Sequence, residues 1–208
     1  ALNQFKNLIT DFIPVARYSD MLLNPGKNFT FNGQTYQYPN IKLVYWAGGN
    51  PFHHQMNLSK LRKATFKPDT IITNEIWWNS LARHADIIFP TTTTLERNDI
   101  GFRHWEQTVS PMHKAIDPIG NSRNDFDIFS LISEKLAIKE QFTENKNEEE
   151  WLKTLWDEAK ESARENNFYL PDFDQFWNGG FFEVLKPTHE QILMKDFVKK
   201  PEQFPLSN

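Results

Sequence analysis

The sequence predicts an α/β fold with a mainly parallel sheet. Three short apolar runs, at residues 41–46, 70–73 and 86–89, are rich in β-branched and aromatic residues, as buried strands are. Residues 57–67 carry apolar side chains at helical spacing, so the order from 41 onward is strand, glycine turn, helix, strand. A segment of this order and length is a βαβ unit, and the ligands of such units typically lie beyond the carboxyl ends of the strands.

Length and composition limit the class of protein. At 208 residues the chain is long enough for a sizeable core, and we expect a single domain over residues 1–208. A net charge of -4 with 24% charged residues gives no electrostatic footprint for nucleic acid or for an anionic membrane. The lack of cysteine excludes disulfides, thiolate zinc sites, iron–sulfur ligation and cysteine nucleophiles in this chain. No apolar run approaches the roughly 20 residues of a membrane span, and the start at Ala1 suggests a fragment or a processed protein.

Before the first strand, residues 1–40 form a lead-in segment. Apolar residues at mixed spacing over residues 1–20 predict a helix that ends at Pro14. Asn32-Gly33 lies between alternating residues, so a small hairpin is expected over residues 28–38.

After the second strand the pattern becomes more varied. Residues 76–85 indicate a short helix or an irregular turn, and Thr93 with Glu96 has the spacing of a capping box, although a run of threonines is equally typical of extended chain. Residues 108–116 predict a further strand or an extended arm.

The last third of the chain has two clear helical patterns. Residues 125–136 and 148–166 are amphipathic, and Thr143 or Asn147 is the expected cap of the second helix. The C-terminal part, 143–208, is otherwise expected to be irregular and rich in aromatic residues, with one more helix near 188–199.

The glycine turn after the first strand is the first candidate binding element. Gly48 and Gly49 allow either a close approach of the backbone to a ligand or simply a tight turn, and with Asn50 they do not form the G-x-G-x-x-G dinucleotide fingerprint. Glu75 ends the second strand, where a carboxylate typically accepts hydrogen bonds from ribose hydroxyls; the alternative is a solvated acid.

Further candidates lie around the second and third strands. Adjacent His53 and His54 diverge in direction, so at most one of them faces a ligand. Arg83 is suited to a phosphate or to an ion pair with Asp86. Thr91 offers hydroxyl and backbone donors just past the third strand, which suit a polar ligand but also helix capping.

Asp99 is the last candidate in this region. It has a carboxylate able to accept two hydrogen bonds from a guanine edge, or it is a solvent-exposed acid. No catalytic constellation and no metal-ligand spacing stands out, so the sequence predicts neither catalytic nor metal-binding residues.

Several stretches of the chain match one family in order and spacing. They are W-A-G-G-N-P-F-H-H-Q (46–55), K-P-D-T-I-I-T-N-E (67–75), A-R-H-A-D-I-I-F-P-T-T-T-T-L-E-R-N-D (82–99), S-R-N-D-F-D-I-F (122–129) and L-P-D-F-D-Q-F-W (170–177). In these stretches the chain resembles the molybdopterin oxidoreductases, and most closely the branch of the dimethyl sulfoxide, trimethylamine N-oxide and biotin sulfoxide reductases. The resemblance covers nearly the whole chain.

The resemblance implies a Rossmann-like three-layer domain, the third domain of a longer polypeptide. That domain would hold one of the two nucleotides of bis-molybdopterin guanine dinucleotide together with domains absent from this chain. Among the cofactor-binding residues carried over by position, Gly49 and Asn50 would approach the pyrophosphate, with Gly48 before them and His54 nearby. Glu75 would contact the ribose or guanosine, and Arg83, Thr91 and Asp99 would complete the nucleotide pocket. The molybdenum ligand is a serine of an earlier domain, so the fragment alone is expected to be inactive.

The activity implied for the intact enzyme is reduction of an N-oxide or S-oxide at molybdenum, with electrons from a quinol-linked cytochrome or a thioredoxin-like donor. Trimethylamine N-oxide in the periplasm, after export of the folded protein, is the first expectation. Biotin or methionine sulfoxide, in the cytoplasm, is the alternative. A stand-alone nucleotide-binding α/β domain without redox chemistry is the rival hypothesis.

Overall fold

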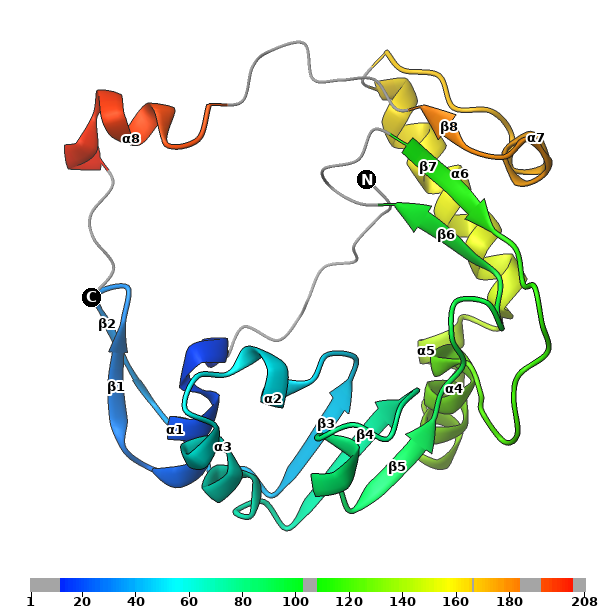
Figure 1. Ribbon diagram of the computed structural model, residues 1–208. Coiled ribbons are helices and arrows are strands. Elements are labelled where there is room, and N and C mark those ends of the chain that lie inside the picture. The colour runs from blue at the N-terminus through cyan, green and yellow to red at the C-terminus, as the bar shows by residue number, and fades with distance from the viewer. Residues whose placement is uncertain (1–11, 103–107, 166, 184–191, 204–208) are drawn as a thin grey trace. The chain divides into compact units, whose positions relative to one another are not determined.

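The computed structural model describes residues 12–102, 108–165, 167–183 and 192–203. Most of the helix expected over residues 1–20 lies outside them. The described residues divide into two compact units: the first unit contains 12–73, 78–87 and 192–203, and the second unit contains 74–77, 88–102, 108–165 and 167–183. Figure 1 shows the elements of both units along the chain.

The three strands predicted from apolar runs are present. They are β3 (Leu43–Ala47), β4 (Thr70–Glu75) and β5 (Ile87–Pro90), and they form a parallel sheet in the order β3-β4-β5. The boundary between the two units runs through β4 and β5. The apolar runs at 41–46, 70–73 and 86–89 located the three strands to within two residues at each end.

The hairpin of the first unit is also confirmed. β1 (Asn28–Phe31) and β2 (Gln34–Gln37) pair antiparallel, with Phe29 opposite Tyr36. Asn32 and Gly33 both have positive φ, 50° and 75°, which is the combination that a two-residue type I′ turn requires. The Asn-Gly pair thus fixes the register of the hairpin.

Short helices complete the first unit. They are η1 (Val15–Arg17), α1 (Tyr18–Leu23), α2 (Pro51–His54), α3 (Leu58–Thr65), η2 (Ala82–His84), α8 (Lys195–Lys199) and η3 (Pro201–Gln203). α3 begins at Asn57, whose Oδ1 accepts a hydrogen bond from the Lys60 N–H at 3.1 Å. α1 and α3 lie side by side (Figure 1), with Leu61 fully buried and an ion pair between Lys60 and Asp20.

The second unit contains an antiparallel sheet. β6 (Asp99–Phe102), β7 (Thr108–Met112) and β8 (Phe182–Glu183) pair in that order, with Ile100 opposite Pro111. Among the described residues, the expectation of a mainly parallel sheet therefore holds for β3 to β5 only, because the other two sheets are antiparallel.

The described residues of the second unit form four helices: α4 (Asp125–Lys135), α5 (Lys139–Thr143), α6 (Glu148–Glu165) and α7 (Phe173–Gly179). Asn147, one of the two expected caps, accepts a hydrogen bond from the Glu150 N–H through its Oδ1 at 2.9 Å, and Glu150 accepts the Asn147 N–H in return. α6 packs along the antiparallel sheet (Figure 1), with Trp156 stacked on Phe176 of α7 at a ring-centroid distance of 3.7 Å. These contacts form the main core of the unit.

Candidate functional site

The glycine turn follows β3 in the first unit. Gly48 and Gly49 have φ of +89° and +74°, a region that side chains with a Cβ rarely adopt. A Cβ built on either residue meets no other atom within 4 Å. The backbone conformation, and not crowding, is therefore the reason for glycine, and the space beside the turn is open to an approaching group.

Asn50 directly follows the two glycines and is only 7% exposed. Its Oδ1 accepts a hydrogen bond from the Phe52 N–H at 3.0 Å, which caps the short helix α2. Its Nδ2 is buried, and within the described part of the chain it has no hydrogen-bond partner. A buried amide donor without a partner is costly, so an acceptor from a bound group would satisfy it.

The remaining candidates of the first unit, His54 and Arg83, are exposed. His54 is the last residue of α2, and Arg83 lies in η2. Asp86 does not pair with Arg83 among the described residues; its carboxylate accepts the Ile71 N–H at 2.8 Å. Arg83 thus keeps the exposed charge that binding of an anion requires.

In the second unit, Glu75 and Thr91 are adjacent. The Thr91 N–H donates to the Glu75 carbonyl oxygen at 3.2 Å, and Thr91 is buried. The Glu75 carboxylate accepts the N–H groups of Ile76 and Trp77 through Oε1, at 3.0 and 3.3 Å. The structure therefore brings together these two predicted residues at the ends of neighbouring strands.

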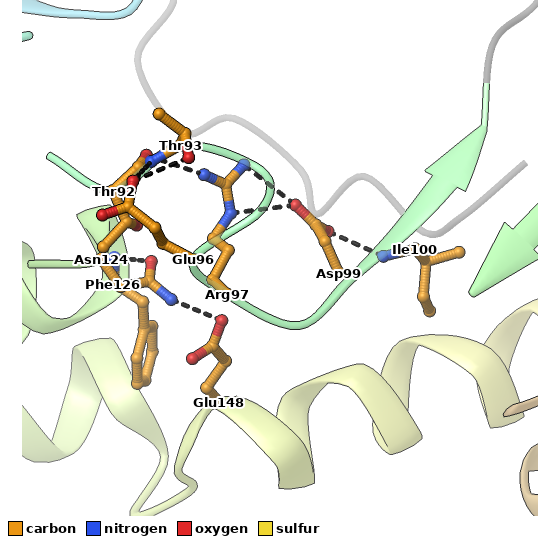
Figure 2. Close-up of polar contacts among 9 residues, drawn as sticks. All are labelled: Thr92, Thr93, Glu96, Arg97, Asp99, Ile100, Asn124, Phe126 and Glu148. Carbon is orange, nitrogen blue, oxygen red and sulfur yellow. Dashed lines mark hydrogen bonds and ion pairs between the residues drawn. The ribbon is translucent and has the colours of Figure 1, made fainter. Parts of the chain in front are cut away.

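Asp99, also in the second unit, is paired with an arginine that we did not predict as a site residue. Arg97 donates to Asp99 Oδ2 through Nε and Nη2, at 3.2 and 3.1 Å, and its Nη1 donates to the Thr92 carbonyl oxygen at 3.2 Å. Asp99 Oδ1 accepts the Ile100 N–H at 2.8 Å. Figure 2 shows the guanidinium between Thr92 and Asp99. Arg97 and the Ile100 N–H thus hold the Asp99 carboxylate in place, while its side chain stays 38% exposed.

Glu96 is the most constrained carboxylate of this region. It is only 4% exposed, and its Oε2 accepts both the N–H and the hydroxyl of Thr93, each at 2.7 Å (Figure 2). Its Oε1 accepts the Ile119 N–H at 2.6 Å and the Ser122 hydroxyl at 3.4 Å. These donors, the Thr93 backbone first, lower the pKa of Glu96 to about 2. The Thr93–Glu96 spacing was predicted, but it closes a turn here and does not start a helix.

The start of α4 is tied to its surroundings by amide side chains. Asn124 caps α4 by accepting the Phe126 N–H at 3.0 Å, and its amide donates to the Glu148 carboxylate (Figure 2). Burial raises the pKa of Glu148. Asn74 donates to Asp125 at 2.7 Å. Two stretches of the family resemblance, 67–75 and 122–129, are therefore in direct contact.

Sequence reasoning missed Arg97, Asn124 and the full role of Glu96. For Asn124 a signal existed, because Asn before a helical pattern is a typical N-cap. The partners of Arg97 and Glu96 depend on tertiary contacts and leave no local pattern.

The described residues supply no metal site of their own. Within them, no group of three or more His, Cys, Asp or Glu side chains is placed to hold a metal ion. None of the described helices is both long and apolar enough to cross a membrane. Of the predicted residues, the first unit holds Gly48, Gly49, Asn50, His54 and Arg83, and the second holds Glu75, Thr91 and Asp99.

The fold defines a class of protein: an α/β protein with a parallel three-stranded sheet whose strands each end in, or are followed by, polar or glycine residues. Residues 4–135 match the profile of the molybdopterin oxidoreductases, and the chain belongs to this family. The family resemblance drawn from the sequence is thereby confirmed. A molybdenum–pterin cofactor is implied by the family, and the open glycine turn and the unpartnered amide of Asn50 fit a bound group with acceptor atoms.

Similar proteins carry the names of the expected branch. A biotin sulfoxide reductase of Cereibacter sphaeroides is 43% identical over 86% of this chain and 24% of its own length. A trimethylamine-N-oxide reductase of Haemophilus influenzae is 45% identical over 93% of this chain and 24% of its own length. A dimethyl sulfoxide/trimethylamine N-oxide reductase of Cereibacter sphaeroides is 43% identical over 82% of this chain and 21% of its own length. The chain thus spans about a quarter of the length of these relatives.

One solved structure supports the fold. Acetylene hydratase from Pelobacter acetylenicus superposes with a TM-score of 0.57 at 14% sequence identity, over 72% of this chain and 19% of the hydratase chain. At this identity the match concerns the fold alone.

Proposed function

We propose that this chain is part of a molybdenum oxidoreductase that reduces an N-oxide or S-oxide by oxygen-atom transfer. Its part would be to hold the guanosine diphosphate portion of molybdopterin guanine dinucleotide. The observation that carries the proposal is the match of 93% of the chain, at 45% identity, to a reductase named for trimethylamine N-oxide. The relatives named for biotin sulfoxide and dimethyl sulfoxide support an S-oxide as the alternative substrate class.

The chain would act as the third domain of the longer enzyme. In this proposal β3, β4 and β5 belong to a Rossmann-like three-layer domain over residues 1–208. It would bind one nucleotide of a bis-molybdopterin guanine dinucleotide jointly with other domains of the polypeptide. The chain matches only about a quarter of the length of each relative, which supports its role as one domain of a longer enzyme.

The first unit would receive the pyrophosphate. Gly48 and Gly49 have no Cβ, so phosphate oxygens can approach their backbone N–H groups. The buried Nδ2 of Asn50 would donate to a phosphate oxygen, and the exposed His54 and Arg83 would lie at the rim of the pocket.

The second unit would receive the guanosine. Glu75, already oriented by two backbone N–H groups, is a preorganised acceptor for ribose hydroxyls. Thr91 would line the pocket. Asp99 accepts three hydrogen bonds from Arg97 and Ile100, so about one of the four acceptor sites of a carboxylate remains for a guanine N–H. A two-bond contact to guanine would require Arg97 to release one of its bonds.

When bound, the cofactor supplies the two-electron redox chemistry that oxygen-atom transfer needs. In this proposal, the residues of this chain bind and orient its nucleotide end. The electron donor would be a quinol-linked cytochrome or a thioredoxin-like protein. The periplasm is the proposed location, with the cytoplasm as the alternative.

Titration of the chain with GDP tests the nucleotide site. Amide chemical shifts confined to residues 48–54, 74–75 and 91–99 are the expected result. No shifts at millimolar GDP, or shifts only elsewhere, would contradict the assigned site.

The same Asn-to-Asp substitution at two helix caps makes the test specific for Asn50. Asn50→Asp keeps the oxygen that accepts the Phe52 N–H but replaces the donor by a charged acceptor, so the Kd for GDP should rise about tenfold. Asn57→Asp makes the same change at the cap of α3 and should leave the Kd unchanged. Equal effects of the two variants would count against a pyrophosphate contact by Asn50.

The rival hypothesis, a stand-alone nucleotide-binding domain, makes a different prediction for the gene. If the reading frame does not extend on either side of these 208 residues, the rival gains; an extended frame supports the reductase.

A further inference from the structure

We infer that Glu96 is a positioning residue of the nucleotide pocket: its carboxylate joins the turn between Thr91 and Asp99 to residues 119–122 and so fixes where those two pocket residues lie. This inference rests on the proposed function.

The contacts of Glu96 come from two segments far apart in the sequence. Oε2 accepts two hydrogen bonds from Thr93, within the turn itself. Oε1 accepts the Ile119 N–H and the Ser122 hydroxyl, more than twenty residues further on. Both carboxylate oxygens are therefore occupied, and each one holds a different segment.

The turn has no regular secondary structure to define its shape. Residues 93–98 belong to no helix and no strand. Besides Glu96, the turn is tied to the following segment by the Leu95 carbonyl oxygen, which accepts the N–H groups of Ala115 and Ile116 at 2.8 and 3.1 Å. Asn98 accepts the Lys114 N–H at 2.9 Å. Because these bonds flank Glu96, its carboxylate is the only side chain among the described residues that closes the turn onto both Thr93 and residues 119–122.

Arg97, the residue after Glu96, connects the turn to the pocket residue Asp99. Arg97 bridges the Thr92 carbonyl oxygen and the Asp99 carboxylate (Figure 2). Glu96 and Arg97 thus act in series within the turn, and they add to the Thr91 N–H bond to Glu75 and to the pairing of Asp99 with Met112 at its two ends. A shift of Glu96 would displace Arg97 and then Asp99.

A carboxylate is needed for this arrangement because the N–H groups of Thr93 and Ile119 and the Thr93 hydroxyl all donate to it. The Ser122 hydroxyl adds only a long contact, since its shorter hydrogen bond, at 2.8 Å, goes to the Ile119 carbonyl oxygen. Glutamine has the same length but only one acceptor oxygen, and its NH₂ group would face a donor of Thr93 or Ile119. The Gln variant therefore leaves at least one buried N–H unsatisfied while it preserves the shape of the site.

The test measures the turn and the pocket separately. In Glu96→Gln, the amide hydrogens of Thr93 and Ile119 should exchange about tenfold faster without any nucleotide, because both lose a charged acceptor. The Kd for GDP should rise about tenfold, and the preference for GDP over ADP should fall, since Asp99 is displaced. Glu134→Gln, which removes an exposed carboxylate paired with Lys139 in the same unit, is the matched control and should change none of these.

A milder variant keeps the test valid if Glu96→Gln does not fold. Thr93→Val removes one hydroxyl donor and retains the carboxylate, so the same readouts should change in the same direction by about two- to fivefold. Faster exchange at Thr93 and Ile119 with unchanged GDP affinity and preference would overturn the positioning role alone. Failure of the wild-type chain to bind GDP would overturn the proposed function, and this inference with it.

Discussion

The stacked pair Trp156 and Phe176 should determine the stability of the second unit, and Phe176→Ala is the direct perturbation. Phe176 is 2% exposed, and its ring lies nearly parallel to that of Trp156, with 9° between the planes and 3.7 Å between the centroids. Removing a buried Phe typically costs about 3–5 kcal/mol. The loss of a stacked neighbour places this site in the upper part of that range, at about 4–5 kcal/mol.

The indole N–H of Trp156 reports on this loss. It donates to the Pro171 carbonyl oxygen at 2.9 Å in a buried position, so it exchanges with solvent only when the unit opens. A loss of about 4 kcal/mol should speed its exchange about a thousandfold. The urea midpoint of the chain should fall in parallel.

Phe181→Ala provides the matched control, because Phe181 is 69% exposed in the same aromatic segment. It should change exchange of the Trp156 indole less than threefold, since a surface substitution typically changes stability by less than about 0.5 kcal/mol. An indole exchange rate in Phe176→Ala within threefold of wild type, or equal effects of the two variants, would refute the assignment of this pair as the core.

Three further predictions concern the turn, the first unit and the acid stability. Gly48→Ala should lower the free energy of unfolding by about 1–2 kcal/mol, because Gly48 has a φ of +89° that alanine rarely adopts. Gly179→Ala is the control: Gly179 ends α7 without a positive φ, so the substitution should be neutral or stabilising. Equal urea midpoints of the two variants would contradict this prediction. Leu61→Ala, fully buried, should cost about 2–5 kcal/mol in thermal unfolding, and the half-exposed Leu58→Ala less than about 1 kcal/mol. Folding lowers the pKa of Glu96 from 4.5 to about 2, so the contribution of its carboxylate to stability is complete above pH 4.5 and disappears as the pH falls toward 2. Glu96→Gln should therefore reduce the slope of the unfolding free energy against pH in this window. An unchanged slope would contradict this prediction.

Elements with a strong periodic signal were predictable from the sequence. β3, β4 and β5 came from uninterrupted apolar runs, and α4 and α6 from apolar residues three and four apart. The hairpin β1–β2 followed from one Asn-Gly pair. In each case the local preference and the tertiary structure agree.

Other elements depend on contacts that no local pattern encodes. β6 contains Gly101 and starts with the polar Asp99, so its strand signal is weak, and it forms because β7 pairs with it. α7 is rich in aromatic residues, which are modest helix formers, although the capping box of Asp172 and Gln175 was a usable signal.

The same contrast applies to the candidate site. The Gly48-Gly49 turn and the strand-end position of Glu75 were visible in the sequence because each follows an apolar run directly. The hydrogen bond from the Ile119 N–H to Glu96 could not be predicted, because the two residues are 23 positions apart and lie outside any helical or strand pattern.

The contact between Thr91 and Arg123 has a consequence for association between molecules. Arg123 forms an isolated parallel bridge with Thr91: its N–H donates to the Pro90 carbonyl oxygen, and its own carbonyl accepts the Thr92 N–H, both at 3.1 Å. Unpaired backbone at the edge of a sheet is a template on which another chain can add a strand. The Pro90 carbonyl oxygen and the Thr92 N–H offer no such template, since Arg123 of the same unit already occupies both groups. Another chain would have to displace Arg123 before it could add a strand here, at the place where the proposed pocket begins.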